Sequence, residues 1–303
     1  MITVLGAMLP IFALIVVGLL LRRYGPYGDG FWLPAERLNY HFLFPALLVM
    51  SLVKVEIAEV ELLPMAAAMA GAVLLIGGAT YGARRLMPID GPGFAAVFQG
   101  SVRVNTYVAI AAAAALYDSA GLTLVAVGIA VAIPLVNVLS VLVLSRHGVG
   151  AGARGPDALR QIGRNPIILA CVAGIVLNLL ELDLPGVIAR FLDIVGQAAL
   201  PLGLLSVGAA LDITAARNAG RAVGVATFLK LAGLPLATAI LCLAFGVHGA
   251  TAAVAILFNG CPASAASYIL TRQLGGDHRL MAGIITVQTL LAMASLPLLM
   301  LLQ

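Results

Sequence analysis

Runs of about 20 apolar residues recur along the whole chain, and no other feature restricts the possible fold so strongly. A helix of that length crosses a hydrocarbon layer of roughly 30 Å. Of the 303 residues, 62% are hydrophobic and only 10% are charged, against about 25% charged in soluble domains. Aromatic residues are few, which suits packed helices better than an outer-membrane barrel. The sequence therefore predicts an all-α polytopic membrane protein.

Ten such runs can be counted, and we expect each to be a transmembrane helix. They cover residues 2–22, 37–54, 62–83, 93–117, 121–145, 165–182, 189–212, 219–245, 249–271 and 280–302. The first run has no basic segment before it and no small-residue cleavage site, so we expect it to be retained as a spanning helix.

Basic residues separate the connections into two classes. With the connections numbered alternately, Lys54 and Arg190 fall on one side, and the other side receives Arg22, Arg23, Arg37, Arg84, Arg85, Arg146, Arg154, Arg160, Arg164, Arg217, Arg221, Arg272 and Arg279. The positive-inside rule places this second side in the cytoplasm. We therefore expect an inner (plasma) membrane protein with both termini outside. The net charge of +4 reflects this topology, and nucleic acid is not an expected partner.

The two halves of the chain resemble each other at an offset of 156 residues. The offset aligns Pro10 with Pro166, Gly18 with Gly174, and Pro45 with Pro201. Since each half would hold five spans, the second half enters the bilayer from the opposite side, and the repeats are inverted. Secondary transporters use such repeats to build two access states around a midplane site. We expect repeats at 1–145 and 165–303, joined by a cytoplasmic linker at 146–164.

Polar residues interrupt the fourth and ninth predicted spans at equivalent positions. A broken helix leaves free N–H groups and free carbonyls in the middle of the membrane, where they can bind ions or polar ligands. The candidate substrate-binding residues are Arg103, Asn105, Thr106, Asn259, Pro262, Ser264 and Ser267. The simpler alternative is that the small residues are packing contacts and that Pro262 makes an ordinary kink.

Two basic residues lie inside predicted spans, where a charge is costly unless it is paired or functional. Arg103 could bind a substrate carboxylate through two parallel hydrogen bonds, or it could cap carbonyls of a broken helix. Lys230 could be a coupling residue, although we rather expect it to snorkel or to pair with Asp212.

Enzyme chemistry has no sequence signal. No HExxH motif, Cys/His cluster or Ser-His-Asp arrangement is visible, and the three cysteines have neither ligand nor disulfide spacing. We expect no enzyme activity, no cofactor and no metal.

Five segments together resemble the auxin efflux carrier family, whose plant members are the PIN-FORMED proteins. They are HFLFPALLVMSLV, RVNTYVAI, NPIILACVAGIVLNLL, LPLGLLSVGAAL and CPASAASYILTRQLGGD. The resemblance implies ten helices in inverted repeats, with broken helices four and nine crossing. It also implies a scaffold of helices one, two, six and seven, an elevator-like transport unit of helices three to five and eight to ten, and a homodimer.

The resemblance further implies an organic anion held at the crossing, with Asn105 and Pro262 matching the family's Asn and Pro. Plant members have a proline before that Asn, whereas this chain has Val104, so the fourth helix could be less sharply unwound.

We expect a secondary transporter of small organic anions, auxin-like or dicarboxylic, that exports them across the inner membrane. A sodium-coupled symporter of the bile-acid type, or a membrane sensor that binds an organic acid without moving it, remain alternatives at this point.

Overall fold

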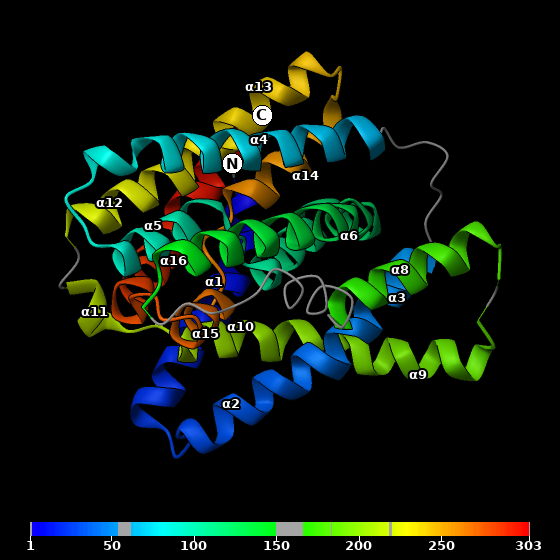
Figure 1. The fold of residues 1–303 in the computed structure, drawn as a ribbon. Helices are drawn as coiled ribbons and strands as arrows, with labels where there is room; N and C mark the ends of the chain where they lie inside the picture. Colours follow the sequence, from blue (N-terminus) through cyan, green and yellow to red (C-terminus); the bar gives the residue numbers. More distant parts are fainter. Residues whose placement is uncertain (1, 54–61, 150–165, 183, 218–219, 303) are drawn as a thin grey trace.

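The computed structural model describes residues 2–53, 62–149, 166–182, 184–217 and 220–302. Every regular element in these ranges is a helix (Figure 1), which confirms the predicted all-α class. Six helical stretches there are long and apolar enough to cross a membrane: Val4–Tyr24, Leu62–Leu86, Gly91–His147, Gly186–Ala209, Arg221–Ala244 and His278–Leu301. The ten-span count and the inverted repeats stay predictions. Most of the expected linker at 146–164 lies outside the described residues.

In the first half of the chain, a π-helical turn and a 3-10 turn accompany the α-helices. Its elements are α1 (Ile2–Tyr24), α2 (Asp29–Leu38) with the π-helical turn η1 (Asn39–Leu43) and α3 (Phe44–Val53), α4 (Leu62–Gly82) with η3 (Ala83–Leu86), α5 (Gly91–Val102) and α6 (Thr106–His147). The second half is cut into shorter pieces. They are α8 (Pro166–Leu179), α9 (Gly186–Gln197), α10 (Ala199–Ala209), α11 (Ile213–Arg217), α12 (Arg221–Phe228) with η4 (Leu229–Gly233) and α13 (Leu234–Ala244), α14 (Gly249–Gly260), α15 (Ala266–Gln273) and α16 (His278–Leu301).

The helix α6 covers 42 residues, about twice the length that crosses a bilayer. It is divided at Asp118, whose backbone is non-helical with φ of 50°. Just beyond this point, a Cβ on Gly121 would collide with the carbonyl oxygen of Ala113. The chain therefore bends back on itself at Asp118, in the gap between the predicted fourth and fifth spans.

The helices pack in two groups. In the first group, α1 lies along α10, and α3 packs against α8 and α9, with α2, α9 and α10 together at the bottom of Figure 1. In the second group, α4 packs against α13, and α14 packs against α6 and α13. The helix α6 also contacts α1, α3, α8 and α10, and thereby connects the two groups.

Candidate functional site

The first break in a buried helix lies between α5 and α6. The helix α5 is capped by Asp90, whose Oδ1 accepts a hydrogen bond of 2.8 Å from the Gly93 N–H. It ends at Arg103, which is extended with φ −76° and ψ 147°. Asn105 then caps α6, because its Oδ1 accepts a hydrogen bond of 3.3 Å from the Val108 N–H. The side chain that the sequence singled out thus starts the second half-helix.

The second break lies between α14 and α15. The helix α14 ends at Cys261, which is extended with φ −65° and ψ 149°, close to the backbone angles of Arg103. Pro262 follows and cannot continue a helix. The Oγ of Ser264 accepts a hydrogen bond of 3.3 Å from the Ala266 N–H, where α15 begins. The residue that ends the first half-helix has nearly the same extended backbone at both breaks. Helix α5 is therefore interrupted as sharply as α14, although Val104 stands where the plant proteins have proline.

The two breaks touch each other. The N–H of Asn105 donates a hydrogen bond of 2.8 Å to the carbonyl of Pro262. Gln288 on α16 adds a bridge. Its Oε1 accepts from the Ala263 N–H at 2.9 Å, and its Nε2 donates to the Gly100 carbonyl at 2.9 Å. Backbone groups that two broken helices leave free are therefore satisfied across the crossing.

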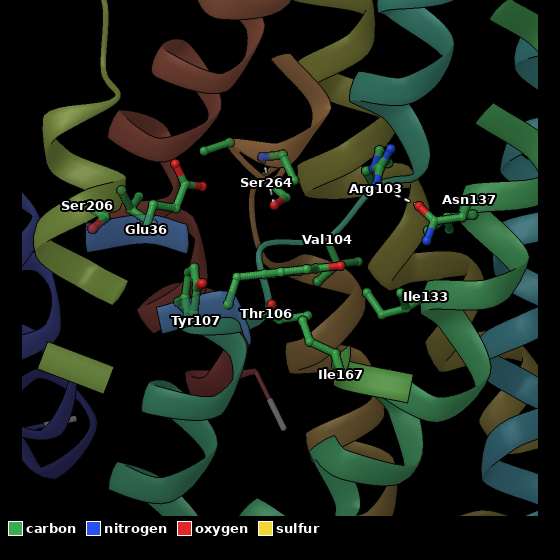
Figure 2. Close-up of a pocket in the computed structure, with 15 residues that line it drawn as sticks. Glu36, Arg103, Val104, Thr106, Tyr107, Ile133, Asn137, Ile167, Ser206 and Ser264 are labelled. Carbon is green, nitrogen blue, oxygen red and sulfur yellow. Dashed lines mark hydrogen bonds between the residues drawn. The ribbon is translucent and has the colours of Figure 1, made fainter. Parts of the chain in front are cut away.

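A cavity of about 70 Å³ lies beside this contact. Figure 2 shows Arg103, Thr106 and Ser264 around it. These three come from the predicted set of site residues. Of the others, Asn105 and Pro262 make the contact between the breaks, while Asn259 and Ser267 are fully buried and do not line the cavity. The Nδ2 of Asn105 has no hydrogen-bond partner among the described residues.

The guanidinium of Arg103 is held in place from two sides. Its Nη2 donates to Asn137 Oδ1 at 2.7 Å, and its Nη1 donates to Gln99 Oε1 at 3.2 Å. A guanidinium has five N–H donors, and these two bonds fix its plane without using them all. Arg103 is therefore a preorganised cation at the edge of the cavity, suited to a carboxylate.

Sequence reasoning missed five polar residues of the cavity, namely Glu36, Tyr40, Tyr107, Asn137 and Ser206. In the view of Figure 2, Glu36 lies on the opposite side of the cavity from Arg103. The sequence did offer a reason to notice Glu36 and Tyr40: they are one helical turn apart, so their side chains share a face of the helix. Asn137 is a polar residue within the apolar predicted span 121–145 and could also have been noticed.

Lys230 does not pair with Asp212, so that expectation is wrong. Its side chain is fully buried, and its Nζ donates a hydrogen bond of 2.9 Å to the carbonyl of Asn259. The Nδ2 of Asn259 donates to Thr238 Oγ1 at 2.8 Å. Asn259 is therefore held by a neighbouring helix stretch rather than turned toward the cavity.

A second and much larger cavity of about 1900 Å³ shares Glu36, Tyr40, Arg103 and Ser206 with the small one. Its wall carries many of the arginines that the charge rule assigned to the cytoplasmic side: Arg22, Arg23, Arg37, Arg217 and Arg272. The small cavity is therefore continuous with a wide, basic vestibule.

A model of the membrane transport protein family, which includes the auxin efflux carriers, matches residues 155–300. Over these residues, just under half of its length, the chain belongs to the membrane transport protein family. The match includes the second helix break and Gln288, and it confirms the resemblance drawn from the sequence. As a member of this family the chain is a multi-pass membrane protein of a transporter type, a class that is usually not enzymatic. No match was found among curated proteins.

Proposed function

We propose that the protein is a secondary transporter that exports small organic anions across the inner membrane. The observation that carries the proposal is the contact between two helix breaks, Asn105 N–H to Pro262 carbonyl at 2.8 Å, directly beside a cavity with a fixed guanidinium. The N-termini of two half-helices, α6 and α15, and one cation lie beside this contact, an arrangement that suits a carboxylate.

The lining of the small cavity suggests which anions fit. Arg103 would bind the carboxylate, and Thr106 and Ser264 would orient it. Glu36 lies across the cavity and, when ionised, would repel a second carboxylate but accept a hydrogen bond. We therefore favour an acid with a hydrogen-bond donor opposite its carboxylate, such as a hydroxy acid or an indole acid, over a plain dicarboxylate.

The two packing groups support a mechanism of alternating access. The group around α1, α3, α8 and α10 would be the scaffold, and the group around α4, α5, α13, α14 and α16 would carry the site across the membrane as an elevator, in a homodimer. The basic vestibule corresponds to the state open to the cytoplasm. Export of one negative charge from a cell with a negative interior is favoured by about 2.3 kcal/mol per 100 mV, so export needs no coupled ion.

The test is the change Arg103→Gln in protein reconstituted into liposomes, with counterflow of radiolabelled malate, malonate and indole-3-acetate. Because a charge-assisted hydrogen bond contributes about 1.5–3 kcal/mol, we expect the apparent affinity for the transported acid to fall about 10- to 100-fold. Asn105→Ala should also impair transport, because the cap of α6 at the crossing is lost.

Arg37→Gln provides the matched control, since Arg37 lines the vestibule but not the small cavity. It should leave the apparent affinity within about twofold of wild type. If both Arg103→Gln and Asn105→Ala transported the acids with the rate and apparent affinity of the wild type, the binding site would lie elsewhere. Binding of an acid without counterflow would instead identify a sensor.

A further inference from the structure

The two half-helices that enter the crossing, α5 and α14, each end with carbonyls that lack a backbone hydrogen-bond partner among the described residues. In α5 the last helical bond runs from the Arg103 N–H to the Gln99 carbonyl, and in α14 it runs from Cys261 to Phe258. The next carbonyls, of Gly100 and Asn259, receive no backbone N–H from the described residues. Both lie at the negative end of a helix dipole, in buried surroundings where a cation is attracted.

These two carbonyls, each just after the last backbone-bonded carbonyl of its half-helix, are satisfied by different chemical groups. The Gly100 carbonyl accepts from the neutral amide of Gln288 at 2.9 Å. The Asn259 carbonyl accepts from Lys230 Nζ, also at 2.9 Å. A neutral side-chain amide is sufficient to satisfy a carbonyl by hydrogen bonding. Lys230 differs from such an amide because it also places a positive charge at the Asn259 carbonyl.

In the described part of the chain, the Lys230 ammonium is bound by a carbonyl oxygen rather than by a counter-ion, and the Cys261 thiol lies close to it. The residue lies in the π-helical turn η4, which packs against α5, α14 and α16. Within the described residues no carboxylate forms an ion pair with it. Nearby, Asn259 Oδ1 is buried and lacks a hydrogen-bond partner in the described part of the chain, and Asn259 Nδ2 bonds to Thr238 Oγ1. Carbonyl and hydroxyl oxygens at a half-helix C-terminus are the ligands with which transporters hold Na⁺.

We propose that the Lys230 ammonium is a built-in cation that occupies, permanently, a monovalent-cation site at the carbonyl end of α14. The chain then needs no sodium ion to complete the crossing. When Lys230 is shortened, the Asn259 and Thr238 oxygens are left as an empty site that accepts Na⁺ from solution.

The first experiment measures thermal unfolding of the purified protein in sodium chloride and in choline chloride, without any organic anion. For wild type we expect the same Tm in both salts. Lys230→Ala should unfold at a lower Tm in choline chloride, and about 100 mM Na⁺ should raise that Tm by about 3 °C or more, because a cation that binds only the folded state stabilises it.

Three results would overturn the proposal. The first is a sodium-dependent Tm of the wild type, which would mean that a mobile cation binds besides Lys230. The second is an unchanged Tm of the Lys230→Ala variant in choline chloride, which would mean that the ammonium does not hold the break together. The third is a destabilised variant that neither Na⁺ nor K⁺ stabilises, which would mean that the oxygens form no cation site. The wild-type measurement is decisive even when the variant does not fold.

A second experiment rests on the proposed function and measures counterflow of malate, malonate and indole-3-acetate in proteoliposomes. Wild type should transport at the same rate, within twofold, in sodium and in choline, whereas Lys230→Ala should transport only in sodium. Sodium-dependent wild-type transport contradicts the built-in cation. Failure of wild type to transport any acid contradicts the proposed function alone, since the stability experiment uses no acid.

Discussion

Gln288 shows how one side chain can hold a broken membrane helix together. It lies on an unbroken helix, yet its amide bonds to the Ala263 N–H after one break and to the Gly100 carbonyl before the other. Its Nε2 also lies 3.2 Å from the Ala226 carbonyl. A buried amide group without a partner costs about 1–3 kcal/mol, so this residue offsets part of the cost of both interruptions.

The change Gln288→Leu keeps the approximate volume and removes the amide. We expect it to lower the free energy of unfolding by about 2–4 kcal/mol, because an N–H and a carbonyl are left buried and unsatisfied. Equilibrium unfolding in detergent measures the loss.

Thr289→Val, at the next position of α16, is the control for Gln288→Leu. Thr289 is equally buried, but its hydroxyl donates only to the Ile285 carbonyl of its own helix. The control should cost about 1 kcal/mol or less. Equal losses from the two changes would mean that the bridge contributes nothing.

At the level of residues, the sequence was sufficient to find Arg103, Thr106 and Ser264, because polar side chains in an apolar span stand out. It could not predict that Asn259 turns away from the cavity, since that depends on Thr238 and Lys230, which belong to another helix stretch. The same applies to Asn137, whose role depends on contact with Arg103 across 34 residues of sequence. Such partners are set by tertiary packing, which the pattern of a single span does not contain.

Among the helices, close glycine contacts fix how the first packing group is assembled. A Cβ on Gly18 in α1 would collide with the Leu205 carbonyl in α10, and a Cβ on Gly208 would collide with the Ile15 carbonyl. A Cβ on Gly174 in α8 would press against Leu52 and the carbonyl of Val49 in α3. The 156-residue offset relates Gly18 to Gly174 and Val49 to Leu205, so the close approach of α1 to α10 has a counterpart in that of α8 to α3.

Gly208→Ala tests whether this close approach holds α1 against α10. The added methyl group meets backbone, which cannot rotate away, so we expect a loss of about 1–3 kcal/mol in unfolding free energy. Gly78→Ala in α4 is the same change at an exposed position with open space around it. There, replacement of a mid-helix glycine should be neutral or stabilising by up to about 1 kcal/mol. If Gly208→Ala and Gly78→Ala had the same free energy of unfolding, α1 and α10 would be able to move apart without cost.

The two helix breaks were predictable because Pro262 and the polar clusters lie at equivalent positions of a repeat. The division of the predicted seventh span into α9 and α10 at Ala198 was not, because the polar residues before it, Asp193 and Gln197, are exposed and bond to each other, and Pro201 lies three residues further on. Apolar side chains alone do not indicate where a buried helix bends, since the bend is set by the helices it packs against.

At the scale of the whole molecule, the important feature is that the small cavity opens into the basic vestibule. The vestibule is lined by arginines from the connections expected in the cytoplasm, and arginines near such an opening raise the local concentration of anions. Charge counts along the sequence predict that this side faces the cytoplasm, which stays a prediction. They could not predict the vestibule, which requires the relative position of α1, α2, α10 and α15.

The orientation and the open state can be tested together with Ser206→Cys, because Ser206 lines both the small cavity and the vestibule. A membrane-impermeant thiol reagent should label this cysteine at least about tenfold faster in inside-out than in right-side-out vesicles, since the basic side is expected to face the cytoplasm. The native Cys171, Cys242 and Cys261 are buried, so the wild type gives the background. Ser140→Cys, fully buried and absent from both cavity walls, should label no faster than that background. Faster labelling from the outside would reverse the topology, and equal labelling from both sides would contradict a site that is open to one side at a time.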